Sequence, residues 1–252
     1  NQGQALVAGT VGQQSFTTKS DNGQPIGSFF VLQTDGIFQS QAEIDASAQK
    51  SAKVGDLRYR DFSGDGQIND DDRVYVGSYQ PKMYFGLSGG FTYKELDFSI
   101  DCYGNFGNQI YNGKKGARVN STDNIESSVA NSYWRSDRTN TDVPRASRDI
   151  LPASTYFVES GDFFRINNIT LGYTIPKKAL ERLKIETLRF YISSQNLLTL
   201  KAYSGFTPEL VNPASVAATT QTPNADATLA PGIELNAYPT TRTFTFGVNL
   251  TF

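Results

Sequence analysis

The chain has 252 residues and a net charge of −2 at pH 7, so nothing in its charge balance directs it toward nucleic acid. Its 22 glycines, 17 phenylalanines and 13 tyrosines, against one methionine and one tryptophan, indicate β-structure rich in turns and aromatic residues. The absence of histidine removes the commonest catalytic base, and the single cysteine, Cys102, excludes an internal disulfide framework.

The first predicted elements are two weak strands, at residues 6–18 and 24–33, separated by a short polar segment at residues 19–23. A long connection rich in serine, aspartate and glycine then covers residues 34–81. The strongest chemical motif of the chain lies within this connection.

That motif is the segment D-F-S-G-D-G-Q-I-N-D-D-D at residues 61–72. Its spacing matches the twelve-residue calcium loop of EF-hand and dockerin type, in which oxygen donors surround a hard cation and a glycine at position six allows a sharp turn. The predicted metal ligands are Asp61, Ser63, Asp65, the backbone carbonyl of Gln67, and Asp72. Ser63 is a poorer ligand than aspartate and Asp72 is shorter than the usual glutamate, so an acidic turn without metal is the alternative. Because the flanking residues favour strands over helices, we expect Ca²⁺ to act as a structural staple.

The clearest hairpin of the chain follows. Apolar side chains alternate with small or polar ones on both sides of a tight turn at residues 93–95, which predicts strands over residues 83–92 and 96–103. Each strand has one apolar and one polar face. Asp97 and Asp101 lie on the polar face, where they are either a working pair of carboxylates or simple lumen-facing residues, and we favour the second interpretation.

A second long connection, residues 107–162, contains the aromatic pair Tyr133 and Trp134. In an exposed loop these rings would stack on a sugar. In a packed loop they would instead hold the loop against neighbouring segments. The sequence leaves both interpretations open.

Two further strands are predicted at residues 163–175 and 187–198. The alternation of the first slips at Asn167 and Asn168, which indicates a β-bulge. Between the strands, residues 176–183 (P-K-K-A-L-E-R-L) predict a short helical turn with proline at its first position.

The last thirteen residues, 240–252, have the most regular pattern. Large apolar side chains occupy every second position from Phe244 to Phe252, and threonine, glycine and asparagine fill the positions between them. In a membrane barrel the apolar face meets lipid and the small polar face the lumen. A half-buried strand of a soluble sandwich shows the same alternation, so this segment alone does not decide between the two.

The connections favour the barrel, because short and long ones alternate. The short ones cover residues 19–23, 93–95 and 176–186, and the long ones cover residues 34–81, 107–162 and 199–239. Outer-membrane barrels combine short periplasmic turns with long extracellular loops in this way. We therefore predict an all-β, antiparallel transmembrane β-barrel. The seven predicted strands are an odd number, so the chain is either the C-terminal part of a larger barrel or an eight-stranded barrel in which one strand was overlooked.

Many short blocks, in order along nearly the whole chain, resemble the C-terminal region of the SusC/RagA family of TonB-dependent outer-membrane transporters of Bacteroidetes. The blocks are residues 25–30 (PIGSFF), 34–39 (TDGIFQ), 61–72, 133–135 (YWR), 143–146 (VPRA), 157–165 (FVESGDFFR), 168–176 (NITLGYTIP), 194–197 (SQNL), 238–239 (YP) and 242–252. The resemblance implies a 22-stranded barrel around an N-terminal plug, a SusD-like surface lipoprotein as partner, and energy from the TonB complex. It also implies import of oligosaccharides or oligopeptides, without covalent chemistry.

The sequence contains no plug and no first half of the barrel, so residues 1–252 are expected to be the C-terminal part, as a fragment or as one piece of a split transporter. The candidate substrate-binding residues are Asp97, Asp101, Tyr133, Trp134 and Arg165. The resemblance also implies that Phe252 is the terminal aromatic that closes the barrel and signals its insertion. Two alternatives remain: a soluble, calcium-stabilised carbohydrate-binding or adhesion domain, and a complete small barrel with an enzymatic lumen. The absence of histidine argues against the latter.

Overall fold

The computed structural model describes residues 5–11, 14–119, 124–181, 185–210, 231–234 and 237–252, which fall into two compact units. The first, called the core unit, consists of residues 1–80, 109–160 and 209–237, and the second, called the sheet unit, of residues 81–108, 161–208 and 238–252. Each unit therefore combines three separate stretches of chain. Within the described residues, no helix is long and apolar enough to cross a membrane.

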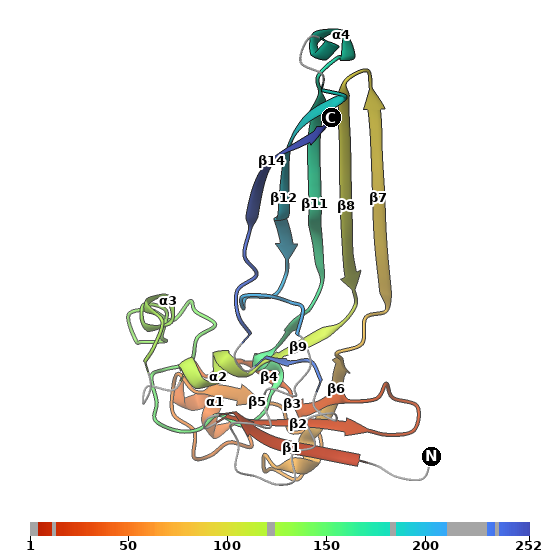
Figure 1. Cartoon of the computed structure of the whole chain (residues 1–252). Coiled ribbons are helices and arrows are strands. Elements are labelled where there is room, and N and C mark those ends of the chain that lie inside the picture. The colour runs from red at the N-terminus through yellow and green to blue at the C-terminus, as the bar shows by residue number, and fades with distance from the viewer. Residues whose placement is uncertain (1–4, 12–13, 120–123, 182–184, 211–230, 235–236) are drawn as a thin grey trace. The chain divides into compact units, whose positions relative to one another are not determined.

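The described strands of the sheet unit form one five-stranded antiparallel sheet with the order β14-β12-β11-β8-β7. The strands lie side by side in Figure 1 and are β7 (Met83–Tyr93), β8 (Leu96–Phe106), β11 (Phe163–Thr174), β12 (Thr187–Lys201) and β14 (Thr243–Thr251). Lys94, with a φ of 53°, makes the tight turn between β7 and β8. The short helix α4 (Lys177–Leu180) lies in the connection from β11 to β12. All five strands were predicted from their alternation.

The register places the apolar residues of the five strands on one common face. One row across the sheet joins directly opposed residues of neighbouring strands: Phe91, Phe98, Leu171, Ile192 and Phe246. Four of these five side chains are at least 39% exposed, and Phe246 reaches 77%. The described residues of the sheet unit thus leave one broad apolar face uncovered.

The predicted bulge in β11 is confirmed by a shift of register between Ile166 and Asn168 against both neighbouring strands. Against β8, Asn167 is the extra residue, and if it continued the regular alternation instead of forming a bulge, Ile166 would lie on the polar face. With it, Ile166 remains on the same face as Ile169. The bulge therefore keeps the two faces chemically distinct along the whole strand.

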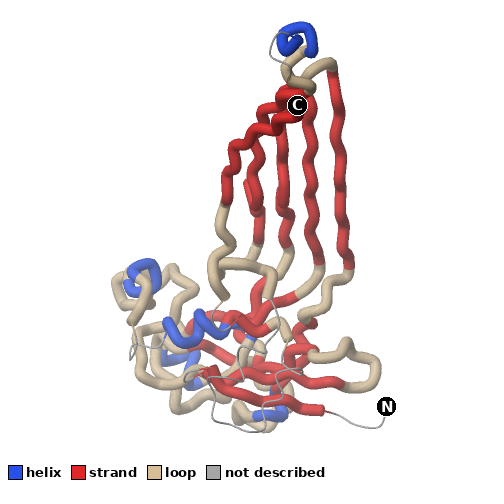
Figure 2. Tube along the Cα trace, viewed as in Figure 1, coloured by secondary structure: helices blue, strands red, loops and turns tan. Residues whose placement is uncertain are grey.

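The described residues of the core unit form three small sheets and several short helices, and Figure 2 distinguishes the strands from the helices by colour. A four-stranded sheet has the order β1-β2-β3-β6, with β1 (Ala5–Val11), β2 (Gln14–Ser20), β3 (Ser28–Leu32) and β6 (Arg73–Ser78). A two-stranded sheet joins β4 (Thr34–Ile37) and β5 (Leu57–Tyr59), and a third has the order β10-β9-β13, with β9 (Gln109–Asn112), β10 (Val158–Ser160) and β13 (Ile233–Glu234). The helices are α1 (Gln41–Asp45), α2 (Gly113–Val119), α3 (Ser127–Ala130) and the 3₁₀ turns η1 (Asp70–Asp72) and η2 (Thr155–Phe157).

A buried hydrophobic cluster joins the three stretches of the core unit. Phe29, Tyr111 and Phe157 are fully buried, and Ile233 from the third stretch packs with them. The ring of Tyr111 lies 6.1 Å from that of Phe29 and 5.9 Å from that of Phe157, and its hydroxyl donates a hydrogen bond of 2.6 Å to the carbonyl of Ser15. The hydrogen bond between Tyr111 and Ser15 joins residues that are 96 positions apart in sequence.

The sequence interpretation is wrong about how the first strands and the long connections are organised. Residues 6–18 and 24–33 do contain strands, but these pair in the four-stranded sheet of the core unit and not with the five long strands. The three long connections likewise contribute strands and helices to the core unit. Period-two alternation indicates a half-buried strand but does not determine which strand it pairs with. The seven predicted strands were therefore all assigned to one barrel.

Candidate functional site

The polar face of the sheet unit carries rows of hydroxyl and amide groups. One row contains Thr245, Ser193, Thr170 and Ser99, and the next contains Thr243, Gln195, Asn168 and Asp101. Asp101 therefore lies beside neutral polar neighbours. Apart from Asp101, the groups of these rows are neutral, and a polar surface of this kind can contact water, a hydroxyl-bearing or amide-bearing ligand, or another polar protein surface.

Asp97 is held in a bidentate ion pair that crosses the central strand. Arg189 Nε and Nη2 lie 2.8 and 2.6 Å from Asp97 Oδ1 and Oδ2. The two residues belong to β12 and β8, and Gly172 of β11 lies between them. A Cβ atom at Gly172 would come within 2.4 Å of both charged groups, so only glycine leaves room for this pair. The pair neutralises Asp97 and removes it as a free carboxylate.

Arg165 is also engaged within the sheet unit. Its side chain is only 3% exposed, with Nε donating to Thr199 Oγ1 at 2.9 Å and Nη1 donating to Tyr103 Oη at 3.2 Å. The guanidinium carbon lies 5.7 Å from the centre of the Phe163 ring. Arg165 therefore ties β8, β11 and β12 together on the polar face, and only a small part of it is open to a ligand.

Tyr133 and Trp134 lie in the core unit, where both pack against neighbours. Tyr133 is 5% exposed, and its hydroxyl donates to the carbonyl of Val119 at 3.0 Å. Trp134 Nε1 donates to Gln39 Oε1 at 2.9 Å, and its ring covers Gly55, where a Cβ atom would approach to 2.5 Å. The packing interpretation therefore describes both rings, and the burial of Tyr133 leaves it unable to stack on a sugar.

The loop at residues 61–72 is closed by its own amide groups. The carboxylate of Asp61 accepts hydrogen bonds from the backbone N–H groups of Gly64 and Gly66, at 2.6 and 2.9 Å. Asp65 accepts from the N–H of Gln67 and from the side-chain amide of Asn69. Gly64 and Gly66 have φ values of 73° and 77°, which supply the sharp turns that the motif requires.

Asp72 is the centre of this loop. It is fully buried, and its carboxylate accepts from the N–H groups of Phe62, Ser63 and Asn69, at 2.9, 3.0 and 2.9 Å. Burial by itself would raise the pKa of Asp72, but the hydrogen bonds from Ser63, Asn69 and Phe62 outweigh burial and hold the pKa below its usual value. The side chain of Asn69 caps η1 in return, which completes a capping box with Asp72.

Within the described ranges, no three acidic or cysteine side chains come together in an arrangement that would hold a metal ion. The predicted ligands Asp61, Asp65 and Asp72 each point into a different set of amide groups. As it stands, the loop therefore has the turns of a calcium loop but not its converging carboxylates.

The structure thus divides the candidate residues between the units. Asp97, Asp101 and Arg165 share the polar face of the sheet unit, while Tyr133, Trp134 and the loop belong to the core unit. Phe252 follows β14 and is 83% exposed.

Sequence reasoning overlooked Arg189 as the partner of Asp97. Opposite charges on the polar faces of two strands, with a glycine on a third, are a usable signal, but only once the strand order is known.

Comparison with known proteins agrees with this fold. No family model matches the chain. The TonB-dependent receptors P3 and P26 of Formosa agariphila are 29% and 30% identical to it over 91% of the chain, which spans 22% and 23% of their lengths. The TonB-dependent receptor SusC of Bacteroides thetaiotaomicron is 26% identical over 76% of the chain, which corresponds to 17% of SusC.

Among solved structures, the RagAB peptide transporter matches 99% of the chain with a TM-score of 0.71 and 22% identity, over 24% of the transporter chain. This likeness establishes an all-β fold with antiparallel sheets of the kind found in that transporter. The relatives are receptors and transporters, not enzymes. In sequence and in fold, the chain therefore resembles the SusC/RagA type of TonB-dependent receptor and corresponds to a minor part of such a receptor's length.

Proposed function

We propose that the chain is the C-terminal part of a transmembrane barrel in the bacterial outer membrane, and that the whole protein is a TonB-dependent nutrient importer. The observation that supports this proposal most directly is that the five strands of the sheet unit present one broad exposed apolar face and one polar face. Lipid covers such an apolar face in an outer-membrane barrel, and the polar face then lines the lumen. Similarity to receptors that are four to five times longer supports the view that further strands, up to 22, complete the barrel.

The proposed partners are the remainder of the barrel with its plug, a SusD-like surface lipoprotein and the TonB complex. The proposed cargo is an oligopeptide or an oligosaccharide. Likeness to the RagAB peptide transporter supports the first, and the hydroxyl and amide rows of the polar face suit either.

Membrane fractionation tests the proposal. The chain is expected in the outer-membrane fraction, and its release should require detergent. Recovery in a detergent-free, high-salt wash would contradict the proposal and favour the soluble carbohydrate-binding or adhesion domain.

Calcium in the loop at residues 61–72 is a separate proposal. Its support is the spacing of the oxygen donors and the turns at Gly64 and Gly66. To bind the ion, the carboxylates of Asp61 and Asp65 would turn from their present amide partners toward one point. Calorimetric titration of chelator-treated protein with CaCl₂ is expected to give a saturable heat that Asp61→Asn abolishes. Absence of heat from the unsubstituted protein would identify the loop as a turn held by its amides alone.

A further inference from the structure

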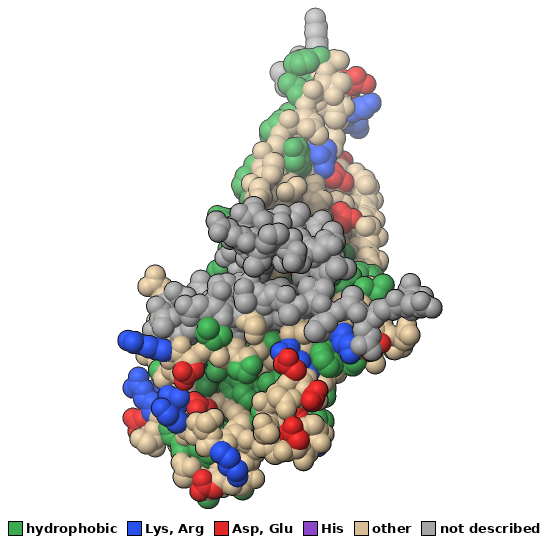
Figure 3. Space-filling view, turned by 90° about the horizontal axis from the view of Figure 1, so that it is seen from below, with side chains coloured by type: hydrophobic (Ala, Val, Ile, Leu, Met, Phe, Trp, Pro, Cys, Tyr) green, Lys and Arg blue, Asp and Glu red, His purple; other side chains and the backbone are tan. Residues whose placement is uncertain are grey.

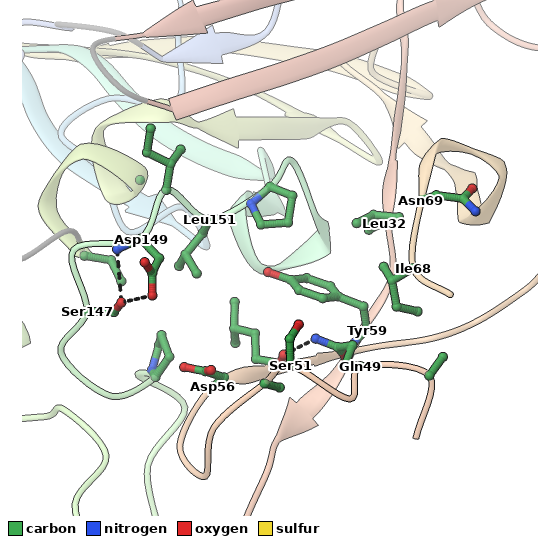
Figure 4. Close-up of a pocket in the computed structure, with 18 of the residues that line it drawn as sticks. Leu32, Gln49, Ser51, Asp56, Tyr59, Ile68, Asn69, Ser147, Asp149 and Leu151 are labelled. Carbon is green, nitrogen blue, oxygen red and sulfur yellow. Dashed lines mark hydrogen bonds between the residues drawn. The ribbon is translucent and has the colours of Figure 1, made fainter. Parts of the chain in front are cut away.

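Residues 134–149 of the core unit, here called the strap, form part of the wall of two cavities. One cavity has a volume of about 500 Å³, and Figure 4 shows the strap residues Ser147 and Asp149 on the opposite side of it from Ile68 and Asn69. The other cavity has a volume of about 580 Å³, and four consecutive residues of the strap line it. Both volumes are within the range of sites that bind small molecules. Because one segment contributes to both walls, a movement of the strap would open both cavities together.

The strap is fixed at its two ends and closed within itself. Tyr133, directly before the strap, is 5% exposed, and Ala153, shortly after it, is fully buried. Between these ends the N–H of Trp134 donates a hydrogen bond to the carbonyl of Val143 at 3.0 Å. The loop that this hydrogen bond closes can therefore move as one body between two anchored ends.

Two strap residues fasten it to one small area beside β5. The ring of Trp134 covers Gly55, and its Nε1 donates to Gln39 Oε1 at 2.9 Å. The N–H of Arg145 donates to the carbonyl of Gly55 at 2.7 Å, and Arg145 Nε lies 2.6 Å from Asp56 Oδ1. These contacts converge on Gln39, Gly55 and Asp56, which together are called the catch.

The catch consists of contacts that water can reach. The side chains of Asp56 and Arg145 are 26% and 23% exposed, and Gln39 is exposed. Ion pairs and hydrogen bonds at such positions contribute little to stability, because water competes for both partners. Segments that are held by a few contacts of this kind open locally while the buried core stays folded. Release of the catch therefore requires less free energy than unfolding of the cluster around Tyr111.

We propose that the strap is a lid, and that release of the catch opens the two cavities together while the core unit remains folded. Gly55 is the point at which this opening can be controlled. Its φ is 94°, and a Cβ atom there would approach the ring of Trp134 to 2.5 Å and Arg145 Cβ to 2.9 Å. A larger residue at this position pushes the closed strap away.

Hydrogen exchange of the full chain in detergent tests whether the strap opens separately. The N–H of Arg145 belongs to the catch, whereas the N–H of Tyr111, which donates to the carbonyl of Gly232, belongs to the core. The first is expected to exchange about tenfold faster than the second. Gly55→Ala should accelerate exchange of the Arg145 amide by a further factor of about ten and leave the Tyr111 amide unchanged.

Gly23→Ala is the matched control for this substitution. Gly23 has a similar φ of 80°, but no atom lies within 4 Å of the position that a Cβ would take. The two variants therefore share the backbone strain, and only Gly55→Ala displaces the strap. Equal exchange of the Arg145 and Tyr111 amides, or equal effects of the two substitutions on the Arg145 amide, would overturn the proposal.

Thiol labelling tests access to the cavities directly. Leu57 lines both cavities and is 3% exposed, whereas Ile110 of β9 is 1% exposed and lines neither. In a chain with Cys102→Ser, Leu57→Cys should react with a maleimide about tenfold faster than Ile110→Cys, and Gly55→Ala should accelerate only the first reaction. Protection of the Tyr111 amide shows that each variant is folded.

Equal labelling rates of the two thiols in folded protein would mean that the cavities open only when the core unfolds, and would contradict the proposal. Neither measurement bears on membrane fractionation, so the test of the lid is independent of the proposed import function.

Discussion

The two units of the chain are stabilised in different ways. The core unit contains a cluster of fully buried aromatic side chains, and its outer surface carries a mixture of acidic and basic side chains (Figure 3). The sheet unit is held by backbone pairing of long strands and exposes its large apolar side chains. A unit of the first kind carries its own hydrophobic core in water, whereas the second depends on an apolar surrounding to cover its face. The comparison predicts that substitutions in the core unit change stability through the burial of side chains within the protein. Substitutions on the apolar face of the sheet unit should act through contact with lipid.

The largest effect is expected for removal of a core ring. Phe157→Ala leaves a cavity beside Tyr111 and should lower the free energy of unfolding of the core unit by about 3–5 kcal/mol. Trp134 is the only tryptophan and lies in the core unit, so its fluorescence during urea unfolding reports this unit selectively. Ile26→Ala, at a side chain that is 63% exposed, is the control and should change little. Similar losses for both variants would show that the rings of the cluster are not its main stabilising contact.

The second prediction concerns the two faces of β11. Leu171→Arg places a charge on the apolar face and should cost about 2–4 kcal/mol if that residue lies near the bilayer midplane, which reduces the amount of chain in the membrane fraction. Thr170→Arg, one residue away on the polar face, should insert normally. If the two variants fractionate alike, the apolar face does not meet lipid.

The third prediction concerns the pH dependence of the loop at residues 61–72. Because the pKa of Asp72 is lower in the folded chain than in the unfolded one, its contribution is complete above the unfolded pKa of about 3.9 and is lost as the pH falls through the folded pKa. Asp72→Asn should lower stability at pH 6 by about 1.5–3 kcal/mol, because a neutral amide replaces a charged acceptor of three N–H groups. The measurement is urea unfolding followed by Trp134 fluorescence at pH 6 and pH 3. The difference between the two proteins should shrink at pH 3, and a constant difference would contradict the role of the carboxylate charge.

The smallest expected effect belongs to the ion pair on the polar face. A double-mutant cycle with Asp97→Asn and Arg189→Gln should give a coupling of about 1 kcal/mol in thermal unfolding in detergent, since both side chains are partly exposed. Asp101→Asn, which has no ion pair within the described residues, is the control and should show no coupling to Arg189. A coupling near zero for Asp97 would mean that solvent screens the pair completely.

The sheet unit was predictable from the sequence to a large extent. Its strands are long, their period-two pattern is nearly unbroken, and the slip at Asn167 and Asn168 marked the bulge. What the pattern did not contain was the order of the strands. For this reason Asp97 was identified as a polar-face residue, while its partner Arg189, two strands away in the sheet, was not.

The core unit was predictable only in fragments. Its strands β1 to β3 left weak signals, and the loop at residues 61–72 was found by its spacing. Most of the unit was predicted to be long loops. The contacts that organise it join residues as distant as Ser15 and Tyr111, and a local sequence pattern does not reveal such contacts. Tyr133 remained ambiguous because its burial depends on contacts outside its own segment. Whether its ring is exposed or buried depends on α2, whose position no local pattern specifies.

The core unit is built from three separate stretches of chain, and this has a consequence for the order of events during biogenesis. The strand β13 pairs with β9, and Ile233 completes the buried cluster, yet four of the five long strands precede this segment. A chain that emerges from its amino-terminal side must therefore expose the unfinished cluster until residues 233–234 arrive. Contacts of such long sequence separation form slowly. The chain would need protection from aggregation during that interval, and a factor that shields apolar surface before membrane insertion would act at this stage.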